Sequence, residues 1–248
     1  MQEENDIIAS SPQSHPIKYN LYFNNDYINY ESPICMIICA ALWRISYLIL
    51  RSLLPTYSPE FCVRILNSIH GVVSAFLGIN QCFIFDWPFD HPEWKTSYIQ
   101  SFIMTFSFGY FVHDTWWMLE YNRTDKTMMC HHVFCMFALT NMIFKGYSGA
   151  QATCALGSME ITNPFLQVRW FLRTARMQAT PLYNSTEATF FVIFLTIRII
   201  IGSYLLNIVL RQPKNNWDFI FMSLGIYTIS WVFLFDMIKY GLRKYARK

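Results

Sequence analysis

Charged residues are scarce in this sequence: Asp, Glu, Lys and Arg make up 14% of its 248 residues, whereas 54% are hydrophobic and 18% aromatic. Soluble domains carry about a quarter charged residues, so this composition argues against a soluble protein. The net charge is only +3, and the basic residues lie between apolar runs rather than in one stripe. A nucleic-acid partner is therefore not expected. Internal repeats and low-complexity segments are also absent.

Apolar runs account for the hydrophobic content, and several approach the roughly 20 residues that cross a bilayer. They lie at about residues 33–50, 61–85, 97–118, 128–144, 149–172, 186–210 and 217–238. The sequence therefore predicts an all-α, polytopic membrane bundle of about seven transmembrane helices.

The chain divides into four parts by composition. The N-terminal part, residues 1–32, is polar and has no basic segment leading into an apolar run, so we expect a mostly flexible tail and no cleavable signal peptide. Residues 33–60 hold the first transmembrane helix and its loop, and residues 61–240 form the main transmembrane domain. Residues 241–248 form a basic C-terminal tail.

Lysine and arginine are distributed unevenly between the two predicted sides of the membrane. One side holds ten of them: Arg51, Arg123, Lys126, Arg173, Arg176, Lys239, Arg243, Lys244, Arg247 and Lys248. The other side holds five: Lys18, Lys95, Lys145, Arg211 and Lys214. The positive-inside rule then places the N-terminus in the lumen or outside the cell and the C-terminus in the cytosol. The sequons at Asn122 and Asn184 would face the cytosol and stay unglycosylated.

The sequence has an odd number of cysteines, and all lie in or beside apolar runs. They are Cys35, Cys39, Cys62, Cys82, Cys130, Cys135 and Cys154. We expect them to be reduced packing residues rather than a disulfide framework. Zinc binding by Cys130 with His131 and His132 is an alternative, but three adjacent helical residues cannot point at one ion. No metal site is therefore expected.

Ionisable residues inside apolar runs mark candidate sites, because charge is costly at membrane depth. His113 and Asp114 lie near the end of the third run, and His131 and His132 lie near the start of the fourth, at a similar depth close to the cytosolic boundary. These histidines could act as general acid or base, with Asp114 or Asp125 fixing the tautomer. The alternative is that they only form hydrogen bonds between helices.

Glu160 lies near the predicted bilayer midplane, and Pro164 predicts a bend there because it removes the backbone hydrogen bond to residue 160. Arg198, midway along the sixth run, is the best-placed cation at this depth. We therefore expect a Glu160–Arg198 ion pair or a shared polar cavity, with a structural or a proton-handling role. A helical wheel puts Asn163 on the face of Glu160. It puts Arg169 roughly opposite, where we favour snorkelling over lipid phosphate binding.

A further polar pair occurs in the second run. Asn67 and His70 are three residues apart, so they share one helical face. We expect this face to form a polar seam inside the bundle rather than a lipid-facing surface.

The ionisable residues belong to a longer series of motifs on successive runs. In chain order these are Gly109, Tyr110 and Asp114, then Asp125, His131 and His132, then Glu160, Thr162, Pro164 and Phe165, then Arg169 and Trp170. In this order and spacing, over about residues 61–240, the chain resembles the TLC-domain family, which includes ceramide synthases and the translocating-chain-associating membrane protein. The resemblance implies an all-helical bundle that encloses a lipid-accessible cavity, in the endoplasmic reticulum, a related endomembrane or the plasma membrane.

The resemblance to ceramide synthases is incomplete. In those enzymes a His-Asp pair follows the His pair by about one span, and both are implicated in acyl transfer from acyl-CoA to a sphingoid base. The corresponding segment here, Gly157 to Glu160, lacks that pair, and His113-Asp114 is not an obvious substitute. We therefore expect a smaller TLC-domain protein that acts in membrane lipid homeostasis by binding, sensing or modifying acyl lipids.

An acyltransferase-like lipid enzyme is the alternative function, with acyl-CoA as co-substrate and no resident cofactor. The expected partners are membrane lipids or acyl chains, and a homo-oligomer stays open. A signalling receptor is disfavoured, because NPFLQ in the fifth run lacks the tyrosine of the receptor motif and no Asp-Arg-Tyr follows the third run. A transporter stays open, although no paired broken-helix halves occur.

Overall fold

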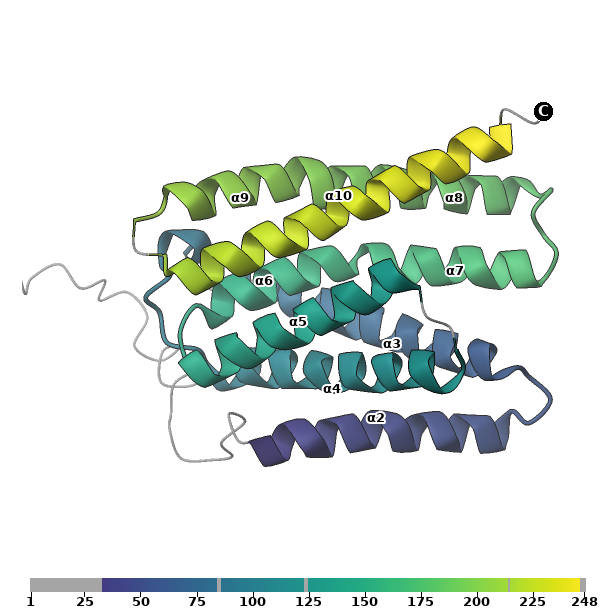
Figure 1. Ribbon diagram of the computed structural model, residues 1–248, viewed down its shortest axis with the longest axis horizontal. Coiled ribbons are helices and arrows are strands. Elements are labelled where there is room, and N and C mark those ends of the chain that lie inside the picture. Colours follow the sequence, from purple (N-terminus) through teal and green to yellow (C-terminus); the bar gives the residue numbers. More distant parts are fainter. Residues whose placement is uncertain (1–32, 84–85, 123–124, 214, 246–248) are drawn as a thin grey trace, which may run out of the picture.

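The computed structural model describes residues 33–83, 86–122, 125–213 and 215–245 (Figure 1). Within these residues the chain is helical, with turns and a single β-bridge between Lys95 and Tyr147, which confirms the predicted all-α fold. The predicted N-terminal tail, residues 1–32, lies outside the described residues.

Successive spans run antiparallel along the bundle, and two of the spans consist of more than one helix (Figure 1). The helices are α2 (Pro33–Leu53), α3 (Pro59–Asn80), the short η1 (Pro88–Asp90), α4 (Tyr98–Glu120), α5 (Lys126–Lys145), α6 (Gly149–Glu160), α7 (Thr162–Thr174), α8 (Pro181–Phe194), η2 (Leu195–Ile201), α9 (Gly202–Arg211) and α10 (Trp217–Tyr245). In Figure 1, α2 lies along one long edge against α4, and α8, α9 and α10 lie along the opposite edge.

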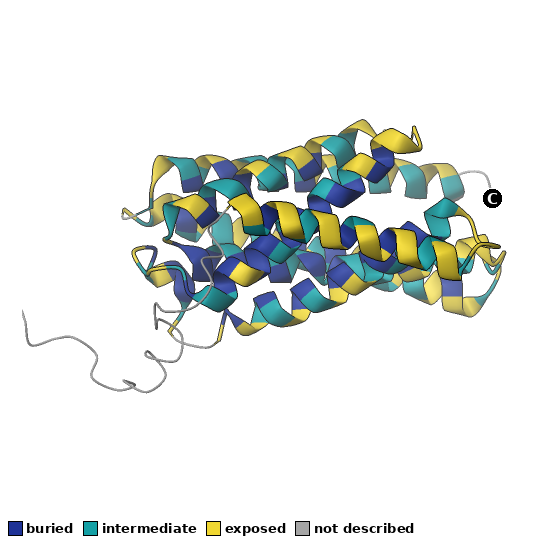
Figure 2. Cartoon of the chain, turned by 90° about the horizontal axis from the view of Figure 1, so that it is seen from below, coloured by how far each residue is buried: buried dark blue, intermediate teal, exposed yellow. Residues whose placement is uncertain are grey.

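Five helical segments among the described residues are long and apolar enough to cross a membrane: Pro33–Leu53, Pro59–Asn80, Lys126–Lys145, Pro181–Arg211 and Trp217–Lys244. Helix α4 is also long, but it buries polar residues such as Gln100 and Asp114. Figure 2 shows exposed residues along the outer faces of the helices, and many of these are large and apolar, including Ile37, Phe76 and Phe235. This surface suits a lipid environment and confirms a membrane protein.

Local capping signals explain where several helices begin and end. The Ser58 side chain accepts a hydrogen bond from the backbone of α3, and Ser97 forms a capping box with Gln100 at the start of α4. Asp125 caps α5, which ends at Gly146 with a φ of 70°, a conformation that glycine adopts at little cost. These residues set the short turns that keep neighbouring helices antiparallel.

The fifth span is broken where the sequence predicts a bend. Helix α6 ends at Glu160 and α7 begins at Thr162, with Ile161 between them. Pro164 has no backbone N–H for the carbonyl of residue 160, which accounts for the break. The Glu160 side chain therefore lies at a helix end inside the bundle.

The sixth span contains a π-helical segment that local sequence signals do not reveal. It covers Leu195–Ile201 and joins α8 to α9. π-Helical turns are rare and frequently occur at functional sites. Arg198 lies at the centre of this segment, so the wider turn sets the direction of its guanidinium group.

Helices α3 and α6 pack with little space between their backbones. A Cβ atom at Gly157 would lie 2.5 Å from the backbone nitrogen of Ile79 and 2.6 Å from the Cα atom of Gly78. Only glycine fits at such a contact, which is the small-residue packing common between membrane helices. The two helices also form one layer of the wall that surrounds Glu160.

The prediction that all cysteines are reduced is wrong for two of them. Cys82, just after α3, and Cys154, in the second turn of α6, form a disulfide. The α3–α6 contact brings them together, and this long-range packing is not visible in the spacing of cysteines within apolar runs. The other five, at positions 35, 39, 62, 130 and 135, are free as predicted.

Candidate functional site

Two adjoining cavities lie inside the bundle. The outer cavity has a volume of about 1090 Å³ and is lined by α3, α4, α5, α7, α8, η2 and α10, reaching the end of the bundle where α7 and α10 end. The inner cavity has a volume of about 130 Å³ and lies among α5, α6, α9 and α10. The size of the outer cavity is that of a small-molecule or lipid site.

Both cavities are lined by four shared residues, Phe111, His131, Glu160 and Arg198, which we call the waist. On the outer side of the waist the lining includes many charged and amide side chains. On the inner side it is mostly Ala, Leu, Met, Phe and Val. The polar outer cavity and the apolar inner cavity therefore meet at the waist, three of whose four residues are ionisable.

Glu160 and Arg198 share a cavity but do not form the direct ion pair offered as the first alternative. Glu160 Oε2 accepts a hydrogen bond from Asn163 Nδ2 at 3.1 Å and lies 3.6 Å from His70 Nδ1. Arg198 Nη2 instead donates to the carbonyl oxygen of Met159 at 3.2 Å. The break after Glu160 exposes the Met159 carbonyl to the guanidinium group. This carbonyl and the Glu160 carboxylate therefore compete for Arg198.

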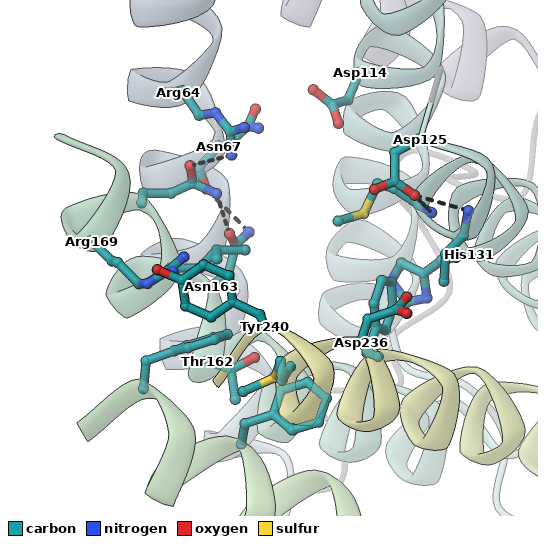
Figure 3. Close-up of a pocket in the computed structure, with 18 of the residues that line it drawn as sticks. Arg64, Asn67, Asp114, Asp125, His131, Thr162, Asn163, Arg169, Asp236 and Tyr240 are labelled. Atoms are coloured by element: carbon teal, nitrogen blue, oxygen red, sulfur yellow. Dashed lines mark hydrogen bonds between the residues drawn. The ribbon is translucent and has the colours of Figure 1, made fainter. Parts of the chain in front are cut away.

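A chain of hydrogen bonds connects the waist with the charged end of the outer cavity. Arg64 Nη1 donates to Gln167 Oε1 at 3.1 Å, and Gln167 Nε2 donates to Asn163 Oδ1 at 2.6 Å (Figure 3). Asn163 then donates to Glu160, so the predicted common face of Asn163 and Glu160 is confirmed. This polar ladder fixes the side chains of α7 that face the cavity.

Arg169 lines the same cavity through contacts with α8 and α10, whereas Glu160 contacts His70 on α3. Arg169 Nε bonds Glu187 Oε1 at 3.0 Å, and its guanidinium lies 4.9 Å from the centre of the Tyr240 ring. Lys244 also pairs with Glu187. The arginine is therefore held by α8 and α10 rather than left to snorkel.

The two adjacent histidines of α5 both line the outer cavity, and His131 also lines the inner one. His132 Nδ1 lies 3.5 Å from Asp114 Oδ2, so Asp114 is the carboxylate placed to orient a histidine. The alternative partner, Asp125, instead accepts hydrogen bonds from the backbone of residues 127 and 128 with Oδ1. His131 packs edge-on against Phe233 on α10 and contacts the sulfur of Cys135.

His113 is not brought to the site. It is buried against Tyr47 of α2, with ring centres 5.5 Å apart, and it does not line either cavity. Cys130, offered as a zinc ligand with the histidine pair, is exposed. The described residues include no group of three or more His, Cys, Asp or Glu side chains placed to hold a metal ion.

The predicted polar seam on α3 is confirmed, because Asn67 and His70 are both buried. The Tyr110 ring stacks on His70 with centres 3.7 Å apart and lines the outer cavity in front of it. Sequence reasoning missed Asp236, a carboxylate inside the seventh apolar run that lines the cavity. It could have been found in the same way as Glu160, as an ionisable residue inside an apolar run. Glu187 lies near a predicted helix end, where an acidic residue is common and does not indicate a site.

Comparison with known proteins agrees with this architecture. A family model described as the TLC domain matches residues 60–239. TLC domain-containing protein 1 of Homo sapiens is 25% identical over 179 residues, which are 70% of this chain and 68% of that protein. A TLC domain-containing protein of Arabidopsis thaliana is 23% identical over 179 residues, 69% of this chain and 70% of that protein. The match to the family model covers most of the chain, and the chain therefore belongs to the TLC-domain family.

Proposed function

We propose that the protein binds an acyl lipid across the two cavities and acts in membrane lipid homeostasis. The observation that carries the proposal is the sharing of His131, Glu160 and Arg198 by a polar outer cavity and an apolar inner one. An amphiphile needs both environments, because its chain gains from apolar burial while its polar part must keep hydrogen-bond partners. The inner cavity then holds part of the chain, and the polar part lies in the outer one.

The waist offers a contact for the first polar group after the chain. Arg198 is only 8% exposed, and its Nε atom has no hydrogen-bond acceptor among the described residues. A buried donor without a partner is costly, so such groups normally have an acceptor. An ester or amide carbonyl at the head of an acyl chain supplies one, with its chain directed toward Leu156 and Met222.

An acyltransferase-like activity is the second candidate, and the contact between His132 and Asp114 favours it. A histidine oriented by a carboxylate can take a proton from a hydroxyl or amine. Both groups line the outer cavity, which could admit acyl-CoA and an acceptor lipid. Glu160 is the carboxylate in the segment that corresponds to the His-Asp pair of ceramide synthases.

We place the protein in the endoplasmic reticulum, a related endomembrane or the plasma membrane, with the N-terminus away from the cytosol. The disulfide between Cys82 and Cys154 supports this orientation. Disulfides persist in oxidising compartments. This bond lies near the ends of α3 and α6 that the distribution of lysine and arginine assigns to the lumen or cell exterior.

The test is to purify the protein and identify the lipids that remain bound, using a variant that fills the inner cavity. Ala138 lines that cavity, so Ala138→Leu and Ala138→Phe should reduce retained acyl lipid progressively. Ala41 is exposed on the outer face of α2, and Ala41→Phe is the matched control that should retain it. Melting temperatures separate blocked binding from misfolding.

Retention of no acyl lipid by the unmodified protein would refute the binding proposal. Enzyme and binding roles are separated by lipid extracts from cells that carry the protein or its His132→Ala variant. Loss of one lipid product with unchanged lipid retention supports catalysis. Unchanged extracts together with unchanged retention support binding or sensing.

A further inference from the structure

Charges in the outer cavity are sorted onto two facing walls (Figure 3). Helices α3 and α7 form the basic wall, and helices α4, α5 and α10 form the acidic wall. Arg64, Arg169 and Arg173 lie on the basic wall together with Glu60, and Asp114, Asp125 and Asp236 lie on the acidic wall. Three further charged residues, Glu160, Glu187 and Arg198, line the cavity from α6, α8 and η2. Sequence reasoning considered these residues singly and did not relate them.

Nearby glutamates do not cancel the positive charge of the basic wall. Glu60 lies 3.4 Å from Arg64, and Glu187 pairs with both Arg169 and Lys244. The three arginines of the basic wall therefore face two glutamates, an excess of one positive charge. Arg173 is exposed and forms no ion pair or side-chain hydrogen bond within the described part of the chain. Each guanidinium has five N–H donors, so the paired arginines can also bind a further anion.

The acidic wall has no lysine or arginine in its described lining. Lys126 follows Asp125 but is exposed and does not line the cavity. Asp114 is 6% exposed, and its ionisable contact is His132. Asp236 forms no ion pair or hydrogen bond within the residues the structure describes. Because no lysine or arginine of the lining neutralises these three carboxylates, this wall favours a positively charged ligand group.

Two buried polar atoms at the inner side of the cavity point independently to a ligand. Asn67 is 7% exposed, and its Oδ1 atom has no hydrogen-bond donor within the described residues. Arg198 Nε likewise has no acceptor there. Both residues line the outer cavity. The site therefore offers an unused acceptor and an unused donor between the charged walls and the apolar inner cavity.

We propose that the outer cavity selects a zwitterionic amphiphile, whose head carries a phosphate and an ammonium group. The inference rests on the proposed lipid-binding function and adds the class of head group. The phosphate lies against the basic wall, the ammonium group against the acidic wall, and a chain carbonyl at Arg198. A phospholipid or lysophospholipid with a choline or ethanolamine head has this chemistry. A purely anionic head meets the acidic wall, and an uncharged head leaves both walls without a counter-charge.

The experiment is a competition among lipids that have identical acyl chains and different heads. Purified protein in detergent receives equal amounts of phosphatidylcholine, phosphatidylethanolamine, phosphatidylglycerol and diacylglycerol, and the retained lipids are quantified by mass spectrometry. The unmodified protein should enrich the two zwitterionic lipids over the other two. Glycerophosphocholine, which has the head but no chains, should displace them only weakly. Its retention in place of the lipids would contradict selection of an amphiphile.

Asp236 is the residue to vary, because it is exposed and free of internal bonds. Asp236→Asn should lower the enrichment of zwitterionic over anionic lipid roughly two- to fivefold, the range of one solvent-accessible ion pair. Asp236→Arg should shift the preference toward phosphatidylglycerol. Asp86→Asn is the matched control, since it removes the same charge from an exposed position outside both cavities.

The outcomes separate this inference from the function on which it rests. Retention of no lipid by the unmodified protein overturns both. Retention of all four heads in equal amounts overturns the inference and leaves acyl-lipid binding standing. An unchanged preference in Asp236→Arg, with an unchanged melting temperature, also overturns it.

Discussion

The glycine contact between α3 and α6 allows a prediction of stability with a built-in control. A Cβ atom at Gly157 would meet backbone atoms of Gly78 and Ile79 at 2.5–2.6 Å, and backbone cannot rotate away as a side chain can. Overpacking of this kind costs about 1–3 kcal/mol. Replacing a helical glycine by alanine also gains about 0.5–1 kcal/mol of helix stability. The net effect of Gly157→Ala should be a loss of up to about 2.5 kcal/mol.

Gly241→Ala measures the gain in helix stability without the overpacking cost. Gly241 lies in α10, and a Cβ atom there meets nothing within 4 Å, so this variant should be slightly stabilised. The difference between the two variants is then the overpacking cost of about 1–3 kcal/mol, or roughly 2–12 °C in Tm for a chain of this size. Thermal unfolding of both purified proteins in one detergent measures it.

The same substitution should also disturb the waist, because Gly157 is three residues before Glu160. A shift of α6 away from α3 lengthens the 3.6 Å approach between Glu160 and His70. Lipid retention should therefore fall in Gly157→Ala and stay unchanged in Gly241→Ala. If Gly157→Ala melts at or above the temperature of Gly241→Ala, the described α3–α6 contact is wrong.

Three further experiments test the disulfide, the Glu187 ion pairs and the membrane orientation. Cys82 and Cys154 should react with a maleimide only after reduction of the unfolded protein, and labelling without reductant would contradict the disulfide. Glu187→Gln should lower stability by about 1–3 kcal/mol, because it removes the carboxylate that pairs with Arg169 and Lys244. Glu120→Gln, which removes a more exposed pair with an arginine, should cost at most about 1 kcal/mol in the same melting assay. Asn184 should carry no glycan in cells, and a mass shift on glycosidase treatment that Asn184→Gln abolishes would contradict a cytosolic α8 start.

Much of the fold follows from local signals that the sequence contains. The apolar runs predicted the helices, and Pro164 predicted the bend after Glu160. The caps at Ser97 and Asp125 are also local, although the sequence analysis did not use them. These features depend on residues within about one helical turn of each other. Helix α10 continues to Tyr245, beyond the predicted end at residue 238, and Arg243 and Lys244 in its last turn suit a helix C-terminus.

The features that could not be predicted depend on contacts between distant segments. Cys82 meets Cys154 only because α3 and α6 pack closely, and Arg198 turns toward a backbone carbonyl only because a π-helical segment carries it. Asp236 was visible as a carboxylate in an apolar run, but its neighbours in space were not.

A structure of the protein determined in a lipid bilayer tests the central claim most directly. The account predicts elongated density that starts in the inner cavity between α5, α6, α9 and α10, passes Glu160 and Arg198, and continues into the outer cavity. Ordered lipid confined to the outer faces of the helices, with both cavities closed by their own side chains, would contradict it.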